Sequence, residues 1–184
     1  AMGLDLKRSD TPKVMQDFLS SILFDVLTGK QATDLVEKIK QFKHEFHKRA
    51  GWEKGSPKRV NNLTMYTAKE KREGRANMPG HVRAAMNWNY LKKLNSDNYS
   101  MQIVDGMKTI VCKLKPNPLG YTSVGYPTDG TTLPAWFKEL PFNDLDMETA
   151  IVDQKIDNLL GVLGWNLREQ TQTVNTFDNL FSFK

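Results

Sequence analysis

Apolar residues recur in pairs every four positions between residues 14 and 27, and this pattern constrains the fold more than any other feature. The pairs are Val14–Met15, Phe18–Leu19, Ile22–Leu23 and Val26–Leu27. Such spacing gives a broad apolar helix face that must be buried against other elements. Thr11 and Pro12 suit the N-cap and the first helical position, and Gly29 suits the helix end. We therefore predict a helix over residues 12–28 within a packed domain.

A second helix is predicted over residues 33–50 and is strongly basic. Its inward positions are Leu35, Ile39, Phe42 and Phe46. Its outward positions are Lys38, Lys40, Lys43, Lys48 and Arg49. Gly51 follows and is expected to stop the helix.

The rest of the chain predicts a helix-rich α+β fold with about four main helices. Further helices are expected over residues 79–94 and 147–163, and residues 51–78 are expected to be irregular, polar and basic. A strand over 107–115 should follow the Asp105-Gly106 turn and pair with 121–126 in a small antiparallel sheet. Polar residues 168–175 lead to a C-terminal tail, which we expect to be extended.

Composition fits an ordinary globular chain. Hydrophobic residues make up 39% and charged residues 26% of the 184 residues. No apolar run approaches the roughly 18 residues that span a bilayer, so no membrane partner is expected, and no signal peptide is visible. The single cysteine, Cys112, lies in an apolar stretch and is expected to be a buried, unreactive thiol in a reducing compartment.

Charge is distributed unevenly along the sequence. Residues 38–93 contain 15 lysines and arginines against four glutamates, a net charge of +11. Residues 129–184 contain four basic against nine acidic residues, a net charge of −5. A basic block of this size favours a polyanion as partner, whereas the acidic end would be repelled from it.

Sequence patterns for catalysis are lacking, and we predict no catalytic residue, no metal ligand and no cofactor in this chain. No P-loop, GxSxG, HExxH, CxxC or GxGxxG motif occurs. His44 and His47 share a helix face but have no third ligand at suitable spacing. Asp144, Asp146 and Glu148 precede a predicted helix, where they would balance its N-terminal dipole.

Three segments are candidates for phosphate contact. Lys7, Arg8, Ser9 and Thr11 precede a helix start, although a plain capped helix would also account for them. The second segment offers Lys58, Arg59, Asn61 and Asn62, and the third offers His81 and Arg83 beside Asn87. In the third segment Val82, Ala85 and Met86 should face the core. Together the three segments predict binding to nucleic acid. They favour contact with its backbone over base reading, because no regular helix carries several base-reading side chains.

Large apolar residues close the sequence at Phe177, Leu180, Phe181 and Phe183. Chain ends are usually polar and frayed, so such residues are expected to have a partner. They either fold back on their own domain or form a short peptide that docks into an apolar groove on another protein.

The order of several segments resembles one protein family. MGLDLKRSDTPKVMQ resembles the palm-to-thumb junction of family B DNA polymerases. VNNLTMY, MPGHVRAAMNWN, DGMKTIVCKLKPNPLG and VGYPTDGT resemble successive segments of the replicative polymerases of large tailed phages of the T-even type. TFDNLFSF resembles their C-terminal clamp-binding peptide, so the likeness covers essentially the whole chain.

This resemblance implies a thumb domain over residues 1–167 and a clamp-binding tail over 168–184. Within the thumb it implies a duplex-gripping region 1–94, a β-containing region 95–140 and the helix 147–163. The implied partners are primer–template duplex DNA, a sliding clamp and the palm domain of the same polymerase. The palm would hold the catalytic aspartates and two divalent metal ions, implied to be Mg²⁺, and no YGDTDS-like segment occurs here. The implied location is the cytoplasm of an infected bacterial host.

The resemblance also assigns roles to the candidate residues. Lys7, Arg8, Ser9 and Thr11 would meet the DNA backbone at the palm–thumb hinge, and the second and third segments would lie along the duplex. The four apolar tail residues would anchor the clamp. A freestanding nucleic-acid-binding adaptor without a polymerase is the alternative, and the coding sequence upstream of Met2 would distinguish the two.

Overall fold

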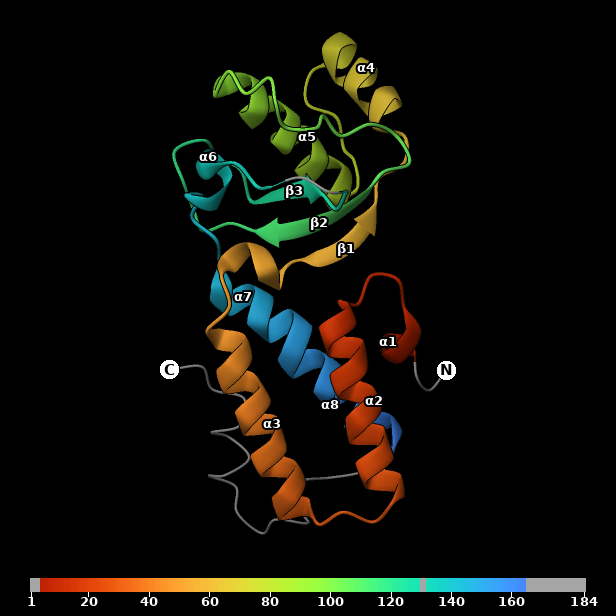
Figure 1. Cartoon of the computed structure of the whole chain (residues 1–184). Coiled ribbons are helices and arrows are strands. Elements are labelled where there is room, and N and C mark those ends of the chain that lie inside the picture. Colours follow the sequence, from red (N-terminus) through yellow and green to blue (C-terminus); the bar gives the residue numbers. More distant parts are fainter. Residues whose placement is uncertain (1–3, 130–131, 165–184) are drawn as a thin grey trace. The chain divides into compact units, whose positions relative to one another are not determined.

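The chain folds into two compact units, each described here by itself (Figure 1). The computed structural model describes residues 4–129 and 132–164. The helical unit comprises residues 4–50 and 144–164, and the sheet unit comprises residues 51–143. The fold is helix-rich α+β with a small antiparallel sheet, as predicted. The predicted tail, with Phe177, Leu180, Phe181 and Phe183, lies outside the described residues.

Three long helical segments build the core of the helical unit. Its elements are α1 (Leu4–Lys7), α2 (Lys13–Leu27), α3 (Ala32–His47), α7 (Asp144–Glu148), a π-helical turn (Thr149–Asp153) and α8 (Gln154–Val162). The buried side chains come from α2, α3 and the segment from the π turn through α8, and they include Ile22, Ile39 and Ile156. Because the two ends of the unit are far apart in sequence, this core joins residues from both ends of the described chain.

The paired apolar pattern gives α2 as predicted. Gly29 adopts φ +80° after the helix, and its N–H donates to the carbonyl of Val26 at 3.2 Å. This left-handed residue is the common way to end a helix, and glycine adopts it without a Cβ clash. The rings of Phe18 on α2 and Phe42 on α3 stack with centroids 3.9 Å apart. The predicted inward positions of α3 thus meet the apolar face of α2.

The prediction that Lys43 faces outward is wrong. Its side chain is buried, and its Nζ lies 2.9 Å from Oδ1 of Asp153 in the π turn. Lys43 follows Ile39 by four residues, so it lies on the same side of α3 as that core residue. The partner carboxylate, 110 residues later in the chain, is what allows the ammonium group to remain inside.

The last helical segment starts earlier than predicted and contains an irregularity. It begins at Asp144, three residues before the predicted start, and a π-helical turn interrupts it at Thr149–Asp153. Asp144 and Asp146 lie in its first turn, where their negative charges interact favourably with the helix dipole, as expected. Glu148, grouped with them in the sequence, is instead completely buried, and its Oε1 lies 2.8 Å from Nδ1 of His47. Glu148 therefore makes a contact within the helical unit.

The sheet unit contains three antiparallel strands in the order β1-β2-β3. Its elements are a 3-10 turn (Gly51–Lys54), β1 (Ser56–Arg59), α4 (Leu63–Glu73), α5 (Gly80–Leu94), β2 (Lys108–Lys113), β3 (Ser123–Pro127) and α6 (Ala135–Lys138). The predicted pairing of β2 with β3 is confirmed, with Val111 opposite Gly125. The predicted helix at 79–94 is confirmed as α5.

The prediction that residues 51–78 are irregular is wrong. They form the 3-10 turn, β1 and α4. Leu63 is the one α4 residue that is buried, so this helix lacks the apolar stripe by which a helix is recognised in a sequence. Strand β1 is only four residues long and contains Pro57. A proline in such a short segment argues against a strand, although edge strands tolerate it, and β1 is an edge strand.

Helix α5 packs against one face of the sheet (Figure 1). A Cβ at Gly125 on β3 would lie 3.6 Å from the backbone nitrogen of Ala85, an ordinary van der Waals distance, so β3 and α5 are in close contact at this point. Val82, Ala85 and Met86 are buried as predicted. Cys112 on β2 is also buried, as predicted.

Within the described residues, no helix combines the length and apolar character needed to cross a membrane.

Candidate nucleic-acid interface

The first group of candidate residues forms a tight turn between α1 and α2. The N–H of Thr11 donates to the carbonyl of Arg8 at 3.1 Å, and the amide of Gln16 donates to the carbonyls of both residues at 2.9 Å. The guanidinium of Arg8 contacts both carboxylate oxygens of Asp10 at 3.1 and 3.2 Å. Lys7, Arg8 and Ser9 are exposed. This turn is therefore a fixed, exposed corner with one cation already paired.

Thr11 differs from its neighbours because it is buried, with 1% of its surface exposed. Helix α2 begins at Lys13 and Pro12 occupies the N-cap position, so the predicted cap at Thr11 is displaced by one residue. Its hydroxyl finds no hydrogen-bond partner among the described residues. A buried hydroxyl is closed to a DNA backbone, whereas Lys7, Arg8 and Ser9 remain open to one.

The second group lies at the end of β1. Nη1 of Arg59 donates to the carbonyl of Gly106 at 2.6 Å, which fixes the arginine against the turn before β2. Arg59 is opposite Lys108 in the β1–β2 register. Directly opposed residues lie on the same face of a sheet, so two cations stand side by side there. An anion bound between them would relieve their mutual repulsion.

His81, in the first turn of α5, lies near Lys58 of β1. Partial burial, together with the nearby charge of Lys58, lowers the pKa of His81 below its usual value. The lowered pKa favours the neutral form of the imidazole at pH 7. In that form it can offer a hydrogen bond to a phosphate or sugar oxygen and adds no charge.

Asn61 and Asn62 connect β1 to α4, and both side chains are exposed. Asn62 adopts φ +64°, a left-handed conformation that asparagine tolerates better than most residues. Asp105 accepts hydrogen bonds from the backbone N–H groups of Leu63 and Thr64 and so caps α4 from a distant loop. A hydrogen bond from the Thr64 side chain has the largest effect on the pKa of Asp105 and, together with these two backbone bonds, lowers it. The asparagine pair is thus held in place at a helix start.

Arg83 and Asn87 have internal partners. Nη1 of Arg83 lies 2.8 Å from Oε1 of Glu70 on α4, and Nη2 donates to the carbonyl of Ala76 at 2.9 Å. Asn87 is buried and its amide donates to the carbonyl of Ser123 at 2.9 Å. Arg83 therefore ties α5 to α4, and the expected exposed pair of Arg83 with Asn87 does not form.

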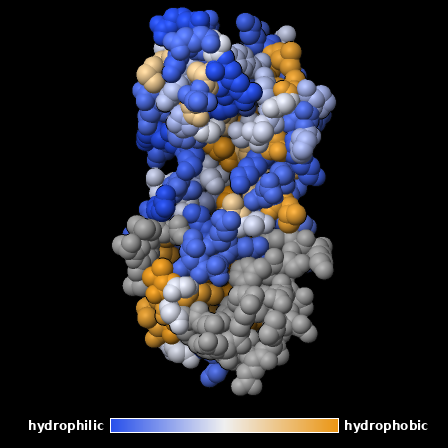
Figure 2. Space-filling model, turned by 180° about the vertical axis from the view of Figure 1, so that it is seen from behind, coloured by the Kyte–Doolittle hydropathy of each residue, from blue (hydrophilic) through white to orange (hydrophobic). Residues whose placement is uncertain are grey.

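The basic block seen in the sequence is divided between the units. Residues 38–50 carry +4 in the helical unit, and residues 51–93 carry +7 in the sheet unit. The sheet unit as a whole has 14 lysines and arginines against seven acidic residues, a net charge of +7. The described residues of the helical unit have ten against twelve, a net charge of −2. Positive charge is therefore concentrated in the sheet unit, whose visible surface is mostly hydrophilic in Figure 2.

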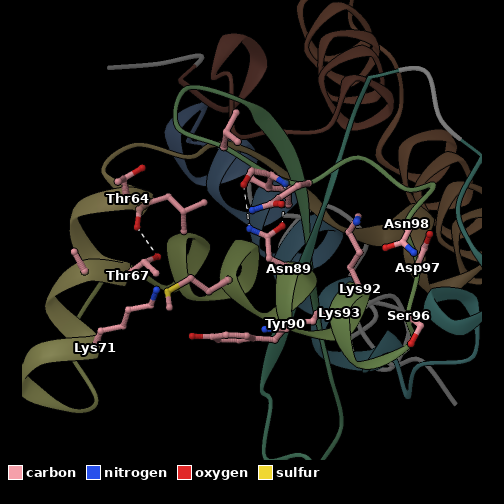
Figure 3. Close-up of a pocket in the computed structure, with 16 residues that line it drawn as sticks. Thr64, Thr67, Lys71, Asn89, Tyr90, Lys92, Lys93, Ser96, Asp97 and Asn98 are labelled. Atoms are coloured by element: carbon pink, nitrogen blue, oxygen red, sulfur yellow. Dashed lines mark hydrogen bonds between the residues drawn. The ribbon is translucent and has the colours of Figure 1, made fainter.

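An open groove of about 860 Å³ also lies in the sheet unit, between α4, α5 and the loop 95–104 (Figure 3). Its cationic side chains are Lys71, Lys92 and Lys93. The groove is not among the predicted sites, because residues 63–73 are not predicted to be helical. The signal available in the sequence was Tyr90 close to Lys92 and Lys93 near the end of the predicted helix 79–94.

The two histidines considered for a metal have different surroundings. His47 contacts buried Glu148, whereas His44 is exposed on the outer side of α3. Among the residues that the structure describes, no three His, Cys, Asp or Glu side chains gather closely enough to hold a metal ion.

Comparison of the sequence with protein-family models and with curated proteins found no match.

Proposed function

We propose that this chain is the thumb and C-terminal region of a phage-type family B replicative DNA polymerase, which holds primer–template duplex through its backbone. The observation that carries the proposal is the concentration of positive charge in the sheet unit, +7 against −2 for the described helical unit. Charge of this kind supports sequence-independent binding that can slide along DNA. The ordered resemblance of the segments to that family supplies the rest.

The proposed duplex contact centres on Lys58, Arg59, Asn61, Asn62 and His81. These residues combine cations, amides and a neutral imidazole around the end of β1. Such a mixture positions a backbone without reading bases. Lys7, Arg8 and Ser9 supply a second contact at the palm–thumb hinge.

The test is fluorescence anisotropy of the protein with two duplexes of unrelated sequence, titrated at several salt concentrations. Lys58→Gln should weaken both duplexes equally and reduce the salt slope by about 0.9. Lys113→Gln is the matched control, since Lys113 is an exposed lysine at the far end of β2. A preference for one sequence, or the absence of binding at low salt, would contradict the proposal.

Arg83 needs a separate experiment because of its pair with Glu70. Arg83→Ala and Glu70→Gln both remove the ion pair between α4 and α5, but only the first removes positive charge. If Arg83 also contacts phosphate, Arg83→Ala weakens duplex binding and Glu70→Gln does not. Equal weakening by both variants would assign Arg83 a purely structural role.

The C-terminal peptide is proposed to bind a sliding clamp, with Phe177, Leu180, Phe181 and Phe183 as anchors. A polymerase tied to a clamp stays at high effective concentration near its DNA. Deletion of residues 176–184 should abolish capture by an immobilised phage clamp and leave duplex affinity unchanged. Loss of duplex affinity would indicate that the peptide belongs to the core of its own domain.

Further parts of the proposal lie outside this chain. The palm domain would carry the polymerase chemistry, and the protein would work in the cytoplasm of the infected host. An open reading frame encoding a palm upstream of residue 2 supports the polymerase, whereas a stop codon there favours a freestanding nucleic-acid-binding adaptor.

A further inference from the structure

The groove between α4, α5 and the loop 95–104 has the charge of an anion-binding site. Lys71 and Lys93 are exposed on the two helices that form its walls, and Lys92 is half-buried beside them. Among the described lining residues the acidic one is Asp97. Its carboxylate already accepts hydrogen bonds from Ser100 and from the indole of Trp136. The groove is therefore net positive.

An aromatic residue, Tyr90, lines the same groove as these lysines. Tyr90 on α5 leaves 47% of its surface exposed. Figure 3 shows Lys71 and Tyr90 reaching into the groove from α4 and α5 respectively. Leu63, Met86 and Ile103 are buried beneath them and give the groove an apolar floor. A large exposed ring over an apolar floor offers a surface on which a flat ligand can stack.

The loop that closes the groove is held rigidly against α5. The amide of Asn89 donates to the carbonyl of Ile103 at 3.0 Å and accepts from its N–H at 2.9 Å. The indole of Trp88 donates to the carbonyl of Met101 at 2.9 Å. Asp97 organises the loop tip through the N–H groups of Tyr99 and Ser100. A wall fixed before the ligand arrives loses little entropy on binding.

We propose that this groove binds an unpaired segment of single-stranded DNA, with Tyr90 stacking on a base and Lys71 and Lys93 contacting phosphates. Aromatic rings next to cations in a groove are the usual means of holding single strands. Bases inside a duplex are covered by their neighbours, so a stacking ring selects unpaired nucleotides. The volume of about 860 Å³ lies in the range of sites that enclose small ligands. This site is separate from the proposed duplex contact at β1 and does not depend on it.

The test uses the whole protein and a short fluorescein-labelled oligothymidylate, followed by anisotropy. Tyr90→Ala should weaken binding by about 5- to 150-fold, as expected for the loss of one stacked base, and Tyr90→Phe should bind like the unmodified protein. Tyr99→Ala is the matched control, because Tyr99 is 98% exposed in the same unit but does not line the groove. Lys71→Gln and Lys93→Gln should each reduce the salt slope by about 0.7, and Lys115→Gln should not.

Blunt duplex DNA, measured in parallel, separates this site from the proposed function. Duplex affinity should be unchanged by Tyr90→Ala and weakened by Lys58→Gln. The inference is overturned if the unmodified protein does not bind the oligothymidylate at low salt. It is also overturned if Tyr99→Ala costs as much as Tyr90→Ala, or if Tyr90→Ala weakens duplex and single strand alike. Because Tyr90 is half-exposed, its truncation should leave the circular dichroism spectrum unchanged.

Discussion

The ammonium group of Lys43 lies 2.9 Å from a carboxylate oxygen of Asp153, and the side chains are only 6% and 10% exposed. Burial lowers the pKa of Lys43 and raises that of Asp153, because desolvation opposes both charges. Each group is thus held inside the helical unit by the charge of the other. The pair joins α3 to the π turn.

Removing one member of this pair should be costly. Lys43→Met leaves the Asp153 carboxylate buried without its cation, and we expect a loss of about 3–5 kcal/mol in the free energy of unfolding. Lys43→Met combined with Asp153→Leu should cost less than either single change. Urea denaturation followed by far-ultraviolet circular dichroism measures all three. Lys48→Met is the control, because Lys48 is an exposed lysine just after α3. A cost no larger than that of the control would contradict the prediction.

The stability contribution of Asp97 should depend on pH. Hydrogen bonds from the hydroxyl and the N–H of Ser100, and from Trp136, hold the pKa of Asp97 below its usual value. A carboxylate with a lowered pKa stabilises the fold above its unfolded pKa, roughly 3.9, and loses that contribution as pH falls further. Asp97→Asn should therefore lower the Tm at pH 7, and the difference from the unmodified protein should shrink below about pH 4.

The control for this pH series is Glu73→Gln at the exposed end of α4. Its Tm should follow that of the unmodified protein throughout. A Tm difference for Asp97→Asn that stays constant from pH 7 to acid would contradict the prediction, because it would show that ionisation of Asp97 does not stabilise the fold.

Asp105 should stabilise the first turn of α4 although it lies 42 residues after Leu63. Asp105→Ala leaves the N–H groups of Leu63 and Thr64 without their acceptor, and we expect a loss of about 0.5–2 kcal/mol, as for other helix caps. Hydrogen exchange read by NMR should show faster exchange at these two amides than in the unmodified protein. Slower or unchanged exchange would mean that solvent replaces the cap at no cost.

Gly55 should not tolerate a side chain. A Cβ at this position would lie 2.6 Å from the backbone oxygen of Val111 and 2.6 Å from Cγ2 of Ile110. The backbone atom cannot move aside alone, so Gly55→Ala should cost about 1–3 kcal/mol or more. Gly80→Ala is the control in the same unit, since a Cβ there meets nothing within 4 Å. Thermal unfolding compares the two, and similar Tm values would contradict the expectation.

Predictions from sequence succeeded where one local pattern decides the structure. The paired residues of α2, the stop at Gly29 and the strands β2 and β3 follow from periodicity and turn residues. Helix α4 was missed because Leu63 is its one buried residue, so the apolar period is absent. This helix is instead held by the hydrogen bond of Asp105 to its first turn and by the ion pair of Glu70 with Arg83, and both contacts join residues that are distant in sequence.

The candidate site was predictable only in part for the same reason. Exposed residues such as Arg59, Asn61 and Asn62 lie together because β1 leads directly into α4. The burial of Thr11 and the pairing of Arg83 depend on tertiary contacts that no spacing reveals. The groove near Tyr90 required both α4 and the 95–104 loop, which a local pattern does not bring together.

The division of the chain into units determines the order in which they can fold during synthesis. The helical core needs Ile22 and Ile39 from the beginning and Ile156 from near the end of the described chain. All residues of the sheet unit leave the ribosome before Ile156 does. Helices α2 and α3 can already pack on each other through Phe18 and Phe42, but the apolar surface that Ile156 covers in the folded unit stays exposed while the sheet unit is made. A nascent chain in this state is the one that a chaperone would be expected to hold.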